Sequence, residues 1–173
     1  MSTLDLRTLK LRSGERFADV REVALEPFEL GGERYVPVPE RPLAALAISR
    51  TSSGLLFELE LEARLIGPCM RCLEDAGVST RISAREYQAT SPGEAEELRT
   101  PYVVDDRLDL SGWARDSVAL SLPAKILCRE ECAGLCGSCG AALARETCTC
   151  GPPEPDARWA ALAALRGQLE GSV

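Results

Sequence analysis

The sequence predicts an α+β protein: an antiparallel sheet of β-hairpins, one helix, a cysteine-rich zinc-knuckle module and a terminal helix. Three observations predict this fold class. Residues 57–65 alternate between apolar and charged side chains, residues 109–120 carry the signals of a capped helix, and six of the eight cysteines lie between residues 128 and 150. These patterns indicate, in turn, a half-buried strand, a helix and a compact thiolate metal module.

The first predicted hairpin joins residues 43–50 to residues 57–65 through a turn at 52–54. In the later segment apolar and charged residues alternate: Phe57, Leu59, Leu61, Ala63 and Leu65 against Glu58, Glu60, Glu62 and Arg64. This period of two predicts a strand with one buried and one solvated face. Residues 78–87 alternate in the same way, so Cys69 and Cys72 are expected at the tip of a second hairpin. Residues 1–40 predict only an extended entry segment followed by turns and edge-like pieces.

The predicted helix at 109–120 has Asp109 or Ser111 as its N-cap and ends before Pro123. Its expected apolar anchors are Leu110, Trp113, Val118 and Leu120. A second helix is expected at 156–166, after a stiff proline-rich linker, with an apolar stripe that docks on the parent domain. The predicted organisation is a β-rich α+β domain at 1–123, a zinc module at 124–151, and a linker with a terminal helix at 152–173.

The cysteines are expected to be reduced thiols that bind metal. The sequence has no apolar run long enough for a transmembrane helix, and its first residues lack the basic start and apolar stretch of a signal peptide. We therefore expect a cytoplasmic protein with no membrane partner. In that compartment clustered cysteines more often bind metal than form disulfides.

The formal net charge of −7 shapes the choice of partner. Two zinc ions, each held by four thiolates with a net charge of −2, would lower this total further. Non-specific nucleic-acid binding needs cations against phosphates, so a basic protein is the expected partner. The acidic stretch around Glu94, Glu96 and Glu97 is a candidate docking surface. Direct RNA binding would need a local basic patch, for which Arg71, Arg81 and Arg85 are the best seed.

The chain has no histidine, so its expected zinc sites are all-cysteine. The preferred partition places Cys136, Cys139, Cys148 and Cys150 in one local site, and Cys69 and Cys72 with Cys128 and Cys132 in a second, non-local site. A site made of Cys128, Cys132, Cys136 and Cys139 is the alternative partition. A site whose four positions are all occupied by thiolates leaves no opening for water, so the zinc would be structural.

The competing reading is a redox or iron–sulfur protein that uses the same cysteines. A thioredoxin-type pair is expected at a strand-to-helix turn, whereas Cys69 and Cys72 are expected between two strands. The spacing of Cys132, Cys136 and Cys139 fits radical S-adenosylmethionine enzymes, but too few residues follow for their barrel. The sequence also lacks a histidine base and the phosphate-binding glycine loops. We therefore expect neither an enzyme nor a small-molecule substrate.

The sequence resembles the YceD family, the large ribosomal RNA subunit accumulation proteins. The resemblance is carried by the segment from Cys69 to Glu74, by the run from Asp109 to Pro123, by the cysteines from Cys128 to Cys150, and by the closing Pro155-Asp156-Ala157-Arg158-Trp159. Residues 141–144 lack the asparagine that many relatives carry there, which affects no expected ligand. The resemblance implies a bacterial cytoplasmic protein that supports 23S ribosomal RNA accumulation. Its expected partner is a ribosomal protein or a large-subunit assembly intermediate, with ribosomal RNA contacted locally or indirectly.

Overall fold

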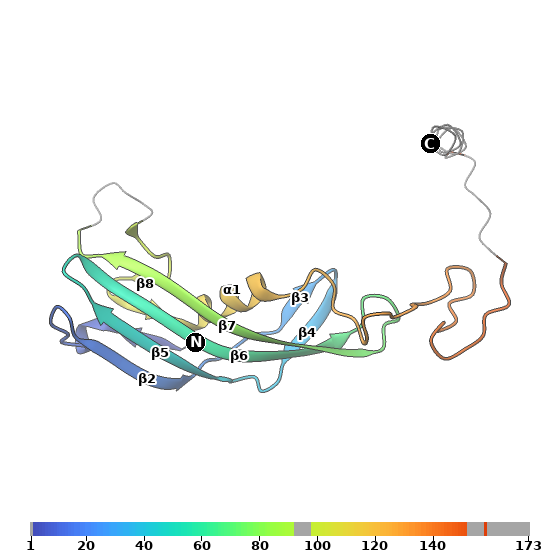
Figure 1. The fold of residues 1–173 in the computed structure, drawn as a ribbon, viewed down its shortest axis with the longest axis horizontal. Helices are drawn as coiled ribbons and strands as arrows, with labels where there is room; N and C mark the ends of the chain where they lie inside the picture. The colour runs from blue at the N-terminus through green and yellow to red at the C-terminus, as the bar shows by residue number, and fades with distance from the viewer. Residues whose placement is uncertain (1, 92–97, 152–157, 159–173) are drawn as a thin grey trace, which may run out of the picture. The chain divides into compact units, whose positions relative to one another are not determined.

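The computed structural model describes residues 2–91, 98–151 and Arg158. The chain divides into two compact units, Met1–Glu130 and Glu131–Val173. The first unit holds the strands and the α-helix of the described chain. It is mostly antiparallel sheet, in which the long hairpin β6–β7 is the central feature (Figure 1).

Strands β6 (Gly54–Pro68) and β7 (Asp75–Ala89) pair along their whole length, from Gly54 opposite Ala89 to Pro68 opposite Asp75. The other side of β6 is shared by two strands. Its first half pairs with β5 (Leu43–Arg50), which β2 (Arg16–Glu22) extends. Its second half pairs with β4 (Glu33–Pro37), which forms a hairpin with β3 (Phe28–Leu30). The turn between β6 and β7 therefore projects beyond most of the pairing.

A small second sheet joins the start of the chain to the start of the helix. Strand β1 (Thr3–Asp5) pairs with β9 (Arg107–Asp109), which pairs with β8 (Val103–Val104). A 3-10 helix, η1 (Leu6–Thr8), follows β1. The two residues between β8 and β9, Asp105 and Asp106, have φ angles of 50° and 59°. Aspartate tolerates this left-handed conformation, which the tightest hairpin turns require at both central positions.

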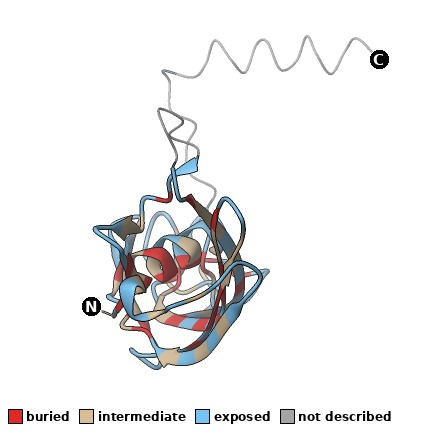
Figure 2. Cartoon of the chain, turned by 90° about the vertical axis from the view of Figure 1, so that its left-hand side faces the viewer, coloured by how far each residue is buried: buried red, intermediate tan, exposed pale blue. Residues whose placement is uncertain are grey.

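The helix α1 (Leu110–Ser121) packs against the inner face of the sheet. Its N-cap is Asp109, whose Oδ1 accepts a hydrogen bond of 3.0 Å from the backbone N–H of Gly112. Trp113 is buried between two aromatic rings: it meets Phe57 of β6 edge-on and stacks on Tyr102. Figure 2 shows the helix enclosed by the curved sheet, with buried residues on the facing surfaces. Because Trp113 fills this space, the core is one helix packed into a curved sheet.

Both predicted hairpins are confirmed, as is the placement of Cys69 and Cys72 at the tip of the second. The five alternating apolar residues of β6 are all buried. Of the four expected helix anchors, Leu110, Trp113 and Val118 are buried, but Leu120 was wrong: it is 89% exposed, one residue before the helix ends. The expected linker, the helix at 156–166 and the loop with Glu94 lie outside the described residues. The domain bounds at 123 and 151 stay predictions.

Candidate metal centres

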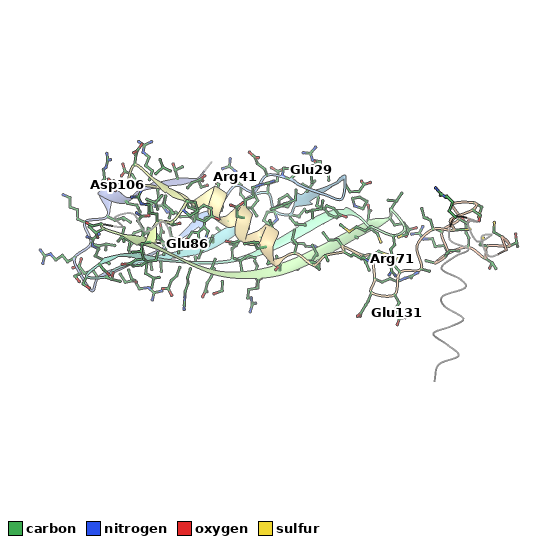
Figure 3. All side chains as sticks on the ribbon, turned by 90° about the horizontal axis from the view of Figure 1, so that it is seen from above. Glu29, Arg41, Arg71, Glu86, Asp106 and Glu131 are labelled. Atoms are coloured by element: carbon green, nitrogen blue, oxygen red, sulfur yellow. The ribbon has the colours of Figure 1, made fainter. Side chains whose placement is uncertain are left out.

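The turn between β6 and β7 folds tightly around Cys69. The backbone N–H of Leu73 donates to the Cys69 carbonyl oxygen at 2.9 Å, and the N–H of Cys69 donates to the Glu74 carbonyl oxygen at 2.6 Å. The N–H of Arg71 points at the Cys69 sulfur, 3.5 Å away. Figure 3 labels Arg71 at this turn, at the end of the first unit opposite Asp106. The turn thus holds Cys69 and Cys72 on one side of a closed loop.

The second Cys-x-x-Cys turn repeats these contacts. The N–H of Gly140 donates to the Cys136 carbonyl oxygen at 2.9 Å, and the N–H of Cys136 donates to the Ala141 carbonyl oxygen at 2.8 Å. The N–H of Ser138 lies 3.4 Å from the Cys136 sulfur. Each bond joins positions with the same spacing as in the first turn, so the two turns share one backbone plan. This plan is a thiolate knuckle, in which backbone amides surround the first sulfur of the pair.

Two further cysteine pairs complete the ligand sets. Cys128 and Cys132 come from the loop after α1, and the sulfurs of Cys72 and Cys128 are 3.6 Å apart. Cys148 and Cys150 close the other set: the Cys148 sulfur lies 3.3 Å from that of Cys136 and 3.6 Å from that of Cys139. All eight cysteines are free thiols, because these separations are far longer than a disulfide bond of about 2.05 Å.

The eight sulfurs fall into two groups of four. Cys69, Cys72, Cys128 and Cys132 form the first group, and Cys136, Cys139, Cys148 and Cys150 form the second; within each group the sulfurs lie within 4.8 Å of one another. This is the preferred partition of the sequence analysis, not the alternative one. A tetrahedral zinc ion with Zn–S bonds of about 2.3 Å needs sulfurs about 3.8 Å apart. Both groups therefore fit such an ion, and that they hold it stays a prediction.

Backbone amides favour a thiolate at the first sulfur of each turn. Burial raises the pKa of the Cys69 thiol, but the N–H groups of Arg71, Cys128 and Cys72 outweigh it, and the pKa falls to about 6. The N–H groups of Cys139 and Ser138 lower the pKa of Cys136 to about 6. In contrast, the sulfurs of Cys148 and Cys139 raise the pKa of Cys150 to about 12. A bound cation would remove this resistance to a second negative charge, and binding would release protons.

The two groups differ in exposure. In the first, Cys69, Cys72 and Cys132 are buried and only Cys128 is exposed. In the second, two sulfur-bearing side chains are exposed and two are half-buried. Exchange of the ion with solvent ligands needs access to the sulfurs, so the two centres differ in how easily a chelator reaches them.

The seed of the basic patch is largely neutralised by the sheet. Arg81 of β7 pairs with Glu62 of β6, which stands directly opposite, and Arg85 lies 3.3 Å from the Glu58 carboxylate. Asp106, in the acidic region, pairs with Arg7 at 3.0 Å, and Asp109 caps the helix. These charges therefore hold the fold together.

One residue of the first turn was missed. Leu73 has a φ of 61° and occupies the position that Gly140, with a φ of 75°, occupies in the second turn. Glycine is the expected residue for this conformation. The equal spacing of the two turns was the signal that could have identified it, but a leucine gave no indication of a left-handed backbone.

The described residues contain no helix of the length and apolarity that a membrane crossing requires. A protein of Mycobacterium tuberculosis, itself uncharacterised, is 30% identical over 175 residues, which cover 95% of this chain and 81% of that protein. One of Mycobacterium leprae is 31% identical over 58% of this chain and 48% of its own. A protein of Arabidopsis thaliana named large ribosomal RNA subunit accumulation protein YCED homolog 1, chloroplastic, is 36% identical over 43% of this chain and 23% of its own. No solved structure was found to match.

A sequence model of one family matches residues 57–166, more than half of the chain, and spans the β6–β7 hairpin, the helix and all eight cysteines. The chain therefore belongs to the YceD family, the large ribosomal RNA subunit accumulation proteins.

Proposed function

We propose that this protein is a non-catalytic, cytoplasmic ribosome-biogenesis factor that supports 23S ribosomal RNA accumulation and large-subunit assembly. Two zinc ions, one in each four-cysteine group, would stabilise its fold. Membership of the YceD family supports the ribosomal role. The single structural observation that carries the metal role is the gathering of eight cysteines into two closed groups of four sulfurs.

The donor chemistry supports a structural rather than a catalytic ion. Four thiolates saturate a tetrahedral zinc ion, so no position would be left for a substrate or an activated water. Bound zinc would hold the β6–β7 turn to the loop after α1 through Cys128. The chain's own amides at Cys69 and Cys136 would stabilise the thiolates that meet the ion.

The metal part is tested by native mass spectrometry and elemental analysis of protein purified under reducing, anaerobic conditions. Two zinc ions per chain are expected. Cys72→Ser and Cys139→Ser should each lose one ion, whereas Ser138→Ala, between two ligands of the second group, should keep both. Iron with acid-labile sulfide would instead support the competing iron–sulfur protein, and a chain with no metal would contradict both.

The ribosomal part is tested in the bacterium that encodes the chain. Deletion of the gene should lower the ratio of 23S to 16S ribosomal RNA, and the wild-type gene should restore it. Complementation by Cys72→Ser should fail where Ser138→Ala succeeds. An unchanged ratio after deletion would overturn the proposed function.

A ribosomal protein, or an assembly intermediate that contains one, is the partner best matched to the charge of the chain. The net charge of −7 favours a basic surface and opposes broad contact with phosphates. A complex formed mainly by these charges should weaken as salt rises.

A further inference from the structure

The face of the sheet that points away from α1 is apolar over β2 and β5. Leu43 and Val20 are 64% and 61% exposed, and Ala45, directly opposite Val20, is exposed as well. On its other face β5 buries Leu46 and Ile48, so this strand is apolar on both sides. A strand of this kind is typical of a sheet that is covered on both faces.

The rest of the same face is polar. Along β6 and β7 the corresponding positions are Glu58, Glu60 and Glu62, followed by Arg85, Ser83 and Arg81 across the ladder. The apolar region is therefore confined to two strands, and it is bordered by a row of carboxylates. A hollow of 590 Å³ lies there, lined by apolar residues that include Val20 and Ala45 and by charged residues that include Glu58 and Glu60.

The middle carboxylate of the row differs from its neighbours. Glu58 is paired with Arg16 at 3.1 Å and with Arg85, and Glu62 is paired with Arg81. Glu60 faces Ser83 on one side and Ala45 on the other. Within the described ranges, no arginine or lysine nitrogen forms an ion pair with Glu60. The hollow thus combines an apolar floor with a negative charge that awaits a cation.

We propose that this hollow binds a basic segment of a large-subunit ribosomal protein. Small apolar side chains of the segment would cover Val20 and Ala45, and a lysine or arginine would pair with Glu60. The charge of the chain favours this occupant, because an RNA strand would bring phosphates against the carboxylate row. The choice of a ribosomal partner rests on the proposed function, whereas the hollow and its charge do not.

The test uses the full, zinc-loaded chain and individually purified large-subunit ribosomal proteins from the same bacterium, with affinity measured by biolayer interferometry. Ala45→Arg fills the hollow and adds a like charge, and should weaken binding about tenfold or more. Glu60→Gln keeps the shape of the surface and should weaken binding about threefold to tenfold, with a smaller dependence on salt.

Two controls match these variants. Ser83→Arg places the same charge in the same row of the same face, on β7, and Glu40→Gln removes an exposed carboxylate outside the hollow. Both should bind within about twofold of the wild type. Equal zinc content and equal unfolding midpoints would show that the variants are folded, and Glu60→Gln tests the proposal even where Ala45→Arg does not fold.

The outcomes separate this proposal from the proposed function. If a ribosomal protein binds and neither Ala45→Arg nor Glu60→Gln weakens it, the hollow is not the site, and the ribosomal role stands. If the chain binds a 23S fragment instead, with Ala45→Arg binding equally, the proposal is overturned. If no ribosomal protein binds, a peptide of alternating lysine and valine is the second probe. Its binding, lost in both variants, upholds a basic-segment site and shifts the failure to the ribosomal role; no binding overturns the site.

Discussion

Leu73 carries a conformation that its side chain does not favour. A left-handed backbone costs a residue with a Cβ about 1–2 kcal/mol, and Leu73 recovers little of this by packing, since its side chain is 60% exposed. The corresponding Gly140 avoids this cost because it has no Cβ.

Replacing Leu73 with glycine should therefore stabilise the turn relative to replacing it with alanine. Both variants remove the leucine side chain, but only Leu73→Gly relieves the backbone strain. We expect Leu73→Gly to exceed Leu73→Ala in free energy of unfolding by about 0.5–1 kcal/mol, measured by urea titration of the zinc-loaded protein. Equal stability of the two variants would show that the turn is not strained.

Tyr102 links the small sheet to the helix by a hydrogen bond that titrates. Burial, followed by its hydrogen bond of 3.0 Å to Asp116 and the charges of Asp116 and Glu86, raises the pKa of Tyr102 to about 12. The unfolded chain ionises near pH 10. The stabilisation is therefore complete below about pH 10 and is lost as the pH rises towards 12.

Tyr102→Phe should cost about 1 kcal/mol of unfolding free energy at pH 8, through loss of the hydrogen bond to Asp116. Between pH 10 and 12 the wild type should lose this advantage, so the two unfolding free energies should converge. The measurement is urea unfolding of both proteins at intervals from pH 8 to pH 11.5. A difference that stays constant across the range would contradict the assignment.

At the scale of the elements, the ring of Tyr35 packs over a glycine of the central hairpin. Tyr35 of β4 is fully buried, and its hydroxyl donates to the Pro68 carbonyl oxygen at 2.7 Å. A Cβ on Gly67 would lie against this ring and 2.8 Å from the Arg34 carbonyl oxygen. Gly77, in the facing strand, has more room: its Cβ would meet nothing closer than 3.4 Å.

These neighbouring glycines give a matched pair of variants. Gly67→Ala should destabilise the first unit by about 2 kcal/mol or more, because Tyr35 has to move. Gly77→Ala should change stability by no more than about 0.5 kcal/mol. Thermal unfolding of the zinc-loaded variants measures both. Similar midpoints for the two would mean that Tyr35 does not fix β4 to the hairpin.

The central hairpins and the helix could be predicted because local patterns specify them. The alternation in residues 57–65 and 78–87 reflects a face that packs on Trp113, and the Asp109 cap is a local signal. Strand β2 could not be found in the same way, because both of its faces mix polar and apolar residues. Its position is determined by pairing with β5, and such non-local pairing leaves little trace in the sequence.

The candidate metal centres divide in the same manner. Cys136 to Cys150 form a local set, which spacing alone could identify. The joining of Cys69 and Cys72 with Cys128 depends on the length of β6 and β7 and on where the loop after α1 runs. Cysteine arithmetic suggested this grouping, but only the fold brings the sulfurs of Cys72 and Cys128 to 3.6 Å.

At the scale of the whole molecule, the two groups should release metal in sequence. The second group has exposed Cys139 and Cys150, whereas three of the first group's four cysteines are buried. With EDTA in excess, native mass spectra should pass from two zinc ions to one before none. Iodoacetamide should label the four cysteines of the second group first. Simultaneous loss, or early labelling of Cys69, would contradict this order.

The pairing of β1 with β9 has a consequence for synthesis of the chain. Leu4 is buried opposite Leu108, and the Ser2 carbonyl oxygen accepts a hydrogen bond from the N–H of Leu110. The earliest residues to leave the ribosomal tunnel therefore wait, unpaired, until more than a hundred later residues have followed. The β6–β7 hairpin can close meanwhile, because its partners are near in sequence. The newborn protein would thus complete its first unit from the middle outwards, with its own beginning joined last.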